Sequence, residues 1–290
     1  MNIKTILVHL DHTDRCNARV DLANRIARTQ GAHLIGLLPS GLLEGTIRAD
    51  AIPTGMTDYI AESTHYLRQR AEGISESFRA RLGAAGAASY EIREVDGTTI
   101  DALVAHGRSS DLIVVGQEDC ASESDVPARG LVAQVMLDAG RPVLVVPYAG
   151  AFEDVGQNVL LAWDGSRAAA VAMREALPLL AHARRVTLVS FRRAGDDEGQ
   201  ALLIPEMSRW LQRHGVQATA EQDITEIDKS DALLSRVCDL GADLIVMGGY
   251  GHSRLREMLL GGVTRKVLAH MTVPVQRIPV AEGVPGGIKG

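Results

Sequence analysis

The chain has 290 residues, of which 46% are hydrophobic and 23% charged, and this length predicts about two globular domains rather than a disordered chain. The 30 Lys and Arg against 36 Asp and Glu give a net charge of -6, and only 3% of the residues are aromatic, so we expect no nucleic-acid partner. No apolar stretch reaches the roughly 18 residues of a membrane helix and no signal-peptide core opens the chain, so we expect a cytoplasmic protein with no membrane partner.

The first half opens with a short, mainly apolar run at Ile6–Asp11 and closes with two more, at Asp111–Gly116 and Arg141–Pro147. Leu112–Val115 is apolar at every position, which is typical of a strand that helices cover on both faces. An insertion, which we place at Gly41–Tyr59, separates the first run from the later ones. We interpret it as a surface insertion, and a lid or partner-contact segment over the first half is the alternative.

The second half alternates short apolar runs with longer amphipathic stretches, which is the pattern of a parallel sheet joined by helices. We predict strands at Val159–Trp163, Arg185–Ser190, Gln217–Glu221, Leu244–Met247 and Val275–Ile278. The spacing of apolar residues predicts helices at Arg167–Ala181, Ser230–Leu240 and Val263–Met271. Gly241 marks the end of the middle helix, and the residues from Ala281 onward are expected to form a loose tail.

The chain also contains an internal repeat. Four pairs of segments match in order: Ile6–Asp11 with Val159–Asp164, Asp101–Leu103 with Asp231–Leu233, Asp111–Gly116 with Asp243–Gly248, and Arg141–Pro147 with Val273–Pro279. The last two pairs share an offset of 132 residues, whereas the first pair is offset by 153, so the first half carries the extra residues. We predict two domains of one kind, at residues 1–148 and 156–280, and a flexible tail at 281–290.

A glycine-rich loop follows the fourth predicted strand of the second half. Gly248-Gly-Tyr-Gly251 is followed by nine residues and then by Gly261-Gly-Val-Thr264, which opens the last helix. Glycines let main-chain N–H groups approach a phosphate, and a helix start adds unpaired N–H groups and the positive end of its dipole. Both features converge at the carboxyl end of a strand, where open α/β sheets bind ligands. Between the glycines lie His252, Ser253, Arg254 and Arg256, of which we expect one or two to face a phosphate.

This loop resembles the signature of the universal stress protein family, which is Gly, two residues, Gly, nine residues, Gly and then Ser or Thr. Gly248, Gly251 and Gly261 match it, whereas Gly262 stands in place of the Ser or Thr and removes one expected hydroxyl contact. The loop is neither a P-loop nor the Gly-x-Gly-x-x-Gly of dinucleotide folds. The resemblance covers nearly the whole chain and implies the two-domain form of the family. It implies an α/β fold of two doubly wound, five-stranded parallel sheets, each with strand order 3-2-1-4-5.

Members of that family commonly dimerise through the last strand of the sheet. For this chain the resemblance implies that Val143–Val146 pairs with Val275–Ile278, which makes an internal pseudo-dimer and covers two open sheet edges. Pairing between two chains, as a homodimer, is a further arrangement that the sequence allows.

The resemblance also implies a nucleotide site. In ATP-binding members an Asp after the first strand contacts the nucleoside, and main-chain groups after the second strand hold the adenine. The corresponding residues are Asp164 and Ser190-Phe191, although Asp164 is equally suited to a turn that caps the next helix. The implied site consists of Asp164, Ser190, Phe191, Gly248, Gly249, Gly251, His252, Ser253, Gly261, Gly262, Val263 and Thr264.

The first half keeps Asp11 and Gly116 but has lost the glycine loop. At the offset of 132 residues, Asp119 takes the place of Gly251 and Arg129 that of Gly261, while Gly130 corresponds to Gly262. Acidic residues crowd the same stretch, namely Glu118, Asp119, Glu123 and Asp125. Like charges disfavour an anion there, so we predict no phosphate binding in the first half and interpret these residues as a solvated surface loop.

Other reactive side chains give no site prediction. His9, Asp11, His12 and Asp14 cluster near the end of the first strand. In a strand His9 and Asp11 point to one face and His12 does not, so we expect polar turn residues rather than metal ligands. The cysteines are odd in number and far apart, which predicts neither a disulfide framework nor a zinc site; they are Cys16, Cys120 and Cys238. No Gly-x-Ser-x-Gly motif marks a serine nucleophile.

The resemblance implies a bacterial stress-response protein whose second domain binds ATP or ADP, with Mg²⁺ beside the phosphates, as a switch read by an unknown protein partner. Gly262 favours a second hypothesis, a nucleotide-independent interaction scaffold or stress chaperone. A third is a slow ATPase or a hydrolase, for which His252 or Asp164 would have to serve as the general base. We name no catalytic residue.

Overall fold

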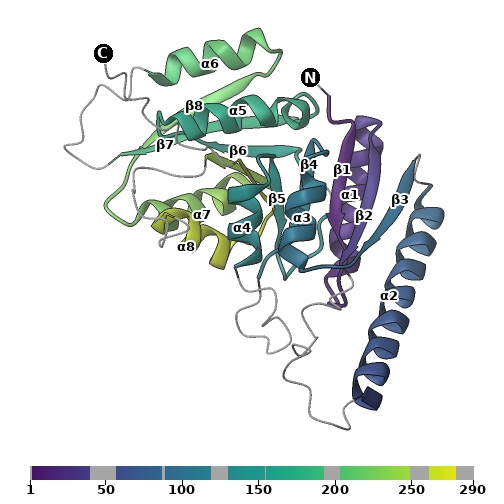
Figure 1. Ribbon diagram of the computed structural model, residues 1–290. Helices are drawn as coiled ribbons and strands as arrows, with labels where there is room; N and C mark the ends of the chain where they lie inside the picture. Colours follow the sequence, from purple (N-terminus) through teal and green to yellow (C-terminus); the bar gives the residue numbers. More distant parts are fainter. Residues whose placement is uncertain are drawn as a thin grey trace, which may run out of the picture.

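The computed structural model describes residues 2–39, 57–86, 89–118, 130–153, 155–192, 203–248 and 261–278. The insertion predicted at Gly41–Tyr59 falls almost entirely outside these ranges, as do Asp119, Arg129 and the tail at 281–290. Strands and helices alternate along both halves of the chain (Figure 1).

The first half contains β1 (Thr5–His9), α1 (Cys16–Gln30), β2 (His33–Pro39), α2 (Thr57–Ala85), β3 (Tyr90–Val95), α3 (Thr99–Gly107), β4 (Leu112–Gly116), α4 (Leu131–Asp138) and β5 (Val143–Val146). The second half contains β6 (Asn158–Ala162), α5 (Arg167–Leu180), β7 (Arg185–Arg192), α6 (Leu203–Arg213), β8 (Ala218–Ile224), α7 (Lys229–Leu240), β9 (Leu244–Gly248), α8 (Gly262–His270) and β10 (Val275–Ile278).

All described strands belong to one ten-stranded sheet with the order β3-β2-β1-β4-β5-β10-β9-β6-β7-β8. Read from its own first strand, each half has the order 3-2-1-4-5 with parallel neighbours, so the predicted α/β fold class is confirmed. The two halves meet where β5 and β10 pair antiparallel, with Val143 opposite Arg277 and Val145 opposite Val275. This is the predicted pairing, and it covers one edge of each half.

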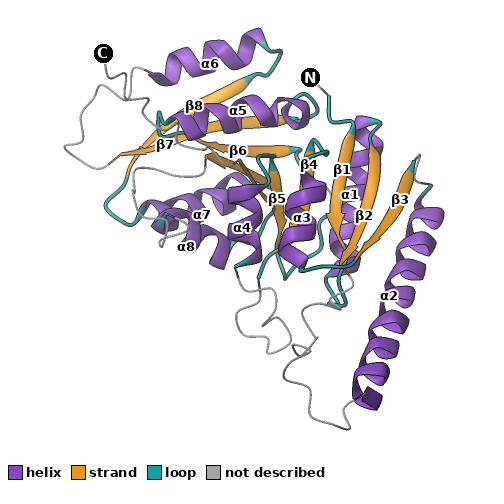
Figure 2. Ribbon diagram, viewed as in Figure 1, coloured by secondary structure: helices purple, strands orange, loops and turns teal. Residues whose placement is uncertain are grey.

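Helices cover both faces of the sheet (Figure 2). One core lies under α1, α2, α5 and α6 and includes Val20, Phe78, Met173 and Leu211. The other lies under α3, α4, α7 and α8 and includes Leu103, Val135, Leu233 and Val267. Along β4, Leu112 and Val114 face the first core and Ile113 and Val115 the second, which is why every position of this strand is apolar.

The helix α2 has no counterpart among the predicted elements. It has 29 residues, and from residue 65 onward, where its side chains are described, the buried ones are Phe78, Leu82 and the polar Ser75, all nearer its carboxyl end, while Tyr66 is 62% exposed. A helix that contacts the core along a short part of its length gives a weak periodic signal in the sequence. Within the described residues, no helix is long and apolar enough to cross a membrane.

Candidate functional site

A cavity of about 290 Å³ opens at the carboxyl edge of the second half of the sheet. The ends of β6, β7 and β9 form its floor, and the starts of α7 and α8 form its sides. Its lining residues are Ala162, Trp163, Asp164, Ser166, Ala168, Val189, Phe191, Lys229, Leu233, Met247, Gly248, Gly261, Gly262, Val263 and Thr264. The volume is close to the lower end of the range of about 300–1,000 Å³ that is usual for small-molecule sites.

Asp164 lies in the turn between β6 and α5. Its Oδ1 accepts a hydrogen bond from the Ser166 amide at 3.0 Å, and Ser166 Oγ in turn accepts one from the Ala169 amide at 3.1 Å. Ser166 is therefore the N-cap of α5, and Gly165 between them has a positive φ of 74°. The turn that we gave as an alternative interpretation of Asp164 does form, and it holds the exposed carboxylate at the cavity.

Gly248 is required where β9 ends against α5. A Cβ at this position would lie 2.4 Å from the Ala169 nitrogen and 2.6 Å from the Ala168 carbonyl carbon, both of which are main-chain atoms. The absent side chain thus lets strand and helix pack closely, a reason that we did not foresee. At Gly261 and Gly262 a Cβ would meet no atom within 4 Å, so these glycines border open space.

The start of α8 lines the cavity, and no side chain of the described residues caps it. Its N-cap residue is Gly261, and its first turn contains no acidic residue. The neighbouring helices differ, because Ser166 caps α5 and Asp228 caps α7. The uncapped N–H groups and the positive end of the helix dipole make this turn the most suitable place in the cavity for an anion.

In the first half, a carboxylate occupies the corner that corresponds to this cavity, at the start of α4. The Glu118 carboxylate accepts hydrogen bonds from the Gly130 and Val132 amides, each at 3.0 Å, at the start of α4. Glu118 is therefore a helix cap, and our interpretation of it as part of a solvated loop is wrong. The residues 132 positions later are Gly262 and Thr264, in the first turn of α8. The Glu118 carboxylate thus occupies the start of α4 in the first half, whereas the corresponding start of α8 in the second half lines the cavity.

A second side chain, that of Arg19, also lies in the first half's corner. The buried Arg19 donates from Nε to the His9 carbonyl at 2.8 Å and from Nη2 to the Asp11 carboxylate at 2.6 Å. A Cβ on Gly116 would lie 2.5 Å from Arg19 Nη1, so the guanidinium reaches the end of β4. At the offset of 153 residues the second half has Ala172 in place of Arg19, which leaves the equivalent volume without a guanidinium.

The pKa values in this corner follow from its burial and its ion pair. Burial lowers the pKa of His9 to about 4, against the opposing attraction of Asp11. Burial raises the pKa of Asp11, but the Arg19 guanidinium, His9 and the hydrogen bonds from Thr13 together outweigh burial and hold that pKa below its usual range. Asp11 also accepts from the Thr13 amide at 3.0 Å, so the polar turn that we expected after the first strand does form.

The structure gathers most of the described site residues around one cavity. Those that line it are Asp164, Phe191, Gly248, Gly261, Gly262, Val263 and Thr264. Ser190 neighbours Phe191 on β7 but is not among the lining residues, whereas Gly249, Gly251, His252 and Ser253 lie outside the described residues. Sequence reasoning missed Lys229 and Leu233, which α7 contributes. Their residue types give no signal in the sequence, and only the order of the elements, with α7 starting after β8 at the same edge of the sheet, places the start of α7 near the site.

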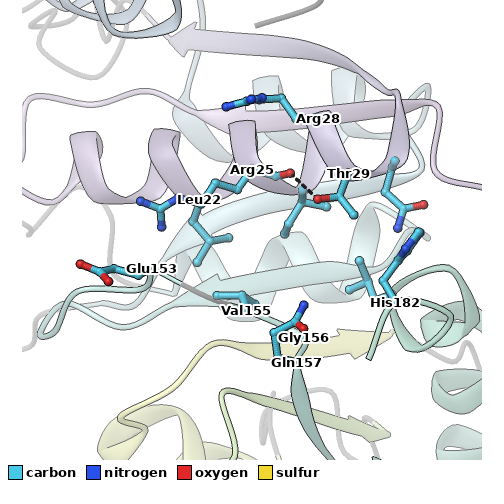
Figure 3. Close-up of a pocket in the computed structure, with 12 residues that line it drawn as sticks. Leu22, Arg25, Arg28, Thr29, Glu153, Val155, Gly156, Gln157 and His182 are labelled. Atoms are coloured by element: carbon cyan, nitrogen blue, oxygen red, sulfur yellow. Dashed lines mark hydrogen bonds between the residues drawn. The ribbon is translucent and has the colours of Figure 1, made fainter. Parts of the chain in front are cut away.

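A second cavity, of about 430 Å³, lies between α1, α5 and residues 153–157 (Figure 3). The carboxyl ends of both helices lie there, and helix carboxyl ends disfavour anions. Its cations do not offset this: Arg25 donates to the Phe152 carbonyl, and in Figure 3 Arg28 points away from Gly156 and Gln157. The larger cavity is therefore the poorer anion site.

Comparisons with known proteins agree with this fold. Residues 156–279 match the model of the universal stress protein family. A universal stress protein of Thermus aquaticus, described as lying in the QAH/OAS sulfhydrylase 3' region, is 33% identical over 134 residues, which are 41% of this chain and 96% of that protein. Universal stress protein Slr1230 of Synechocystis sp. is 23% identical over 213 residues, 71% of each chain.

The solved structure of a universal stress protein from Archaeoglobus fulgidus superposes with a TM-score of 0.73 at 17% identity, covering 96% of this chain and 97% of that one. At this identity the likeness shows the fold alone. The sequence matches go further, since nearly the whole Thermus aquaticus protein is covered at 33% identity. This chain belongs to the universal stress protein family.

Proposed function

We propose that the second half of the chain binds ATP or ADP at the cavity bounded by β6, β7, β9, α7 and α8, and that binding favours a conformation which an unidentified protein partner recognises. Asp164 would contact the ribose or the adenine, and Ser190 and Phe191 would hold the adenine. The phosphates would be held, largely through the main chain, by Gly248, Gly249, Gly251, His252, Ser253, Gly261, Gly262, Val263 and Thr264. Mg²⁺ would accompany them, because their charge needs neutralising.

One observation carries this proposal: within the described residues, no side chain caps the first turn of α8, which lines the cavity, whereas Glu118 caps the same turn of α4. The Gly130 and Val132 amides bind a carboxylate in the first half, and their counterparts in the second half, the Gly262 and Thr264 amides, are suited to a phosphate. Gly262 does not weaken this argument, because a main-chain N–H donates whether or not the residue has a hydroxyl.

The remainder of the cavity suits a nucleoside. Val189, Phe191, Leu233 and Met247 give it an apolar wall, against which a flat base would bury surface. The charged residues among its described lining are Asp164 and Lys229. A few polar groups beside an apolar wall are the usual composition of a small-molecule site.

Native mass spectrometry and thermal unfolding test the proposal. We expect ATP or ADP to co-purify, or excess ATP with Mg²⁺ to raise the melting temperature; a ligand at 100 times its Kd stabilises by about 2.7 kcal/mol. Gly251→Asp, which copies Asp119 of the first half, should abolish that rise. A protein that carries no nucleotide and shows no rise would favour the scaffold hypothesis, and an unaltered rise in the variant would put the site elsewhere.

A further inference from the structure

We infer that Lys229 is a specificity-determining residue that makes the site of the second half select ligands by their phosphate charge. This inference rests on the function proposed above and deepens it, because it assigns the preference for nucleoside polyphosphates over uncharged nucleosides to one side chain. No part of the glycine-loop signature includes this lysine, which belongs to α7.

The position of Lys229 on α7 supports this role. Leu233 and Val237 follow it at intervals of four residues and are buried in the core. Residues four apart lie on one face of a helix, so Lys229 continues the core-facing stripe to the end of the helix, where the cavity takes the place of the core. Side chains on a helix lean toward its amino end, and here that direction leads to the cavity.

The start of α7 fixes the backbone at Lys229. Asp228 is the N-cap, and its Oδ1 accepts a hydrogen bond from the Ser230 amide at 2.9 Å. The lysine between these two residues is exposed, so its main chain is held while its ammonium stays in contact with solvent. An ammonium on such a support can approach a charged ligand at little conformational cost to the protein.

Among the described residues that line the cavity, Lys229 is the cation. Lys266 on α8 lies nearby but pairs with Asp231 at 2.6 Å and Asp228 at 3.8 Å, so its single positive charge is shared between these two carboxylates. The hydrogen bond to Asp231 accordingly raises the pKa of Lys266. Among the described lining residues Lys229 carries the positive charge, and no ion pair found within the described ranges involves it.

The consequence is a graded preference among ligands that share one base. ATP and ADP bring several negative charges, AMP fewer and adenosine none, while the helix amides and the apolar wall are the same for all. Attraction to Lys229 should therefore add most to the affinity for ATP and nothing to that for adenosine. Salt screens an exposed pair, so this part of the affinity should fall as ionic strength rises.

Isothermal titration of the full chain with ATP, ADP, AMP and adenosine tests the inference, using wild type, Lys229→Gln, Lys229→Arg and, as a matched control, Lys4→Gln. Lys4 is an exposed lysine at the start of β1 in the first half, so its loss changes the net charge equally but far from the cavity. We expect Lys229→Gln to weaken ATP binding by about three- to tenfold, to leave adenosine unchanged and to flatten the salt dependence. Lys229→Arg should restore ATP affinity.

Three results would overturn the inference alone. The first is that wild type and Lys229→Gln bind ATP equally well, and the second is that the variant loses affinity for ATP and adenosine by the same factor. A loss in Lys4→Gln as large as that in Lys229→Gln would also overturn it, because the effect would then be one of net charge. If wild type binds neither ATP nor adenosine, the proposed function itself fails and the inference falls with it. Unfolding each variant without ligand checks that the fold is intact.

Discussion

His9 is buried at the end of β1, where burial lowers its pKa from its ordinary value of 6.5 to about 4. Between these two pH values the unfolded chain binds a proton at His9 that the folded chain does not, so stability falls as the pH drops through this window. Asp11 changes the stability only at lower pH, because Arg19 keeps its carboxylate charged in the folded state. We expect His9 to reduce the free energy of unfolding by about 2 kcal/mol between pH 7 and pH 5.

Urea denaturation of wild type and His9→Gln at pH 7 and pH 5 measures this contribution. The variant has no titratable group at this position, so its stability should change less between the two pH values than that of wild type. Equal changes in the two proteins would show that His9 does not carry the pH dependence.

The contact between β9 and α5 gives a prediction about packing between elements. A Cβ on Gly248 would overlap the main chain of Ala168 and Ala169, so Gly248→Ala must push strand and helix apart. Overpacking of this kind costs about 1–3 kcal/mol. Gly262→Ala, on the opposite side of the cavity, meets no atom within 4 Å and should stay within about 0.5 kcal/mol of wild type. Chemical denaturation compares the two variants, and equal stabilities would contradict the packing argument.

Elements with a strong periodic pattern could be predicted closely from the sequence. The strand at Val275–Ile278 is found where it was predicted, and the helix predicted at Ser230–Leu240 begins one residue earlier, at Lys229. The helix α2 was missed because it contacts the core near one end. Glu118 could not be predicted as the cap of α4, because a cap reached across twelve residues depends on where the chain folds back and not on local spacing.

The site itself was predictable only in part, for a physical reason. Glycines and a helix start mark the phosphate side, since a main-chain anion site requires those residue types. Lys229 and Leu233 leave no such mark, because they reach the cavity through the packing of α7 beside α8. The packing role of Gly248 could not be predicted for the same reason, because it depends on contact with α5, which lies far away in the sequence.

In the whole molecule the two halves share one sheet, and the first half also contacts α8 of the second half. The antiparallel pairing of β5 with β10 makes the sheet continuous, and Arg277 is buried there with its Nη1 3.8 Å from Met136 Sδ. Gln117, at the end of β4, donates from Nε2 to the Leu268 carbonyl at 2.7 Å and accepts from the Tyr148 amide at 3.0 Å. The first half therefore holds the carboxyl end of α8, while the amino end of α8 lines the cavity.

Amide resonances of the ¹⁵N-labelled chain during titration with ATP and Mg²⁺ test the central claim most directly, because the two halves offer matched helix starts. Our account predicts that the signals of Gly262 and Thr264 move and saturate at one ATP per chain, while those of Gly130 and Val132, which hold the Glu118 carboxylate, stay in place. Movement at Gly130 and Val132 instead, or no movement at Gly262 and Thr264, would contradict it.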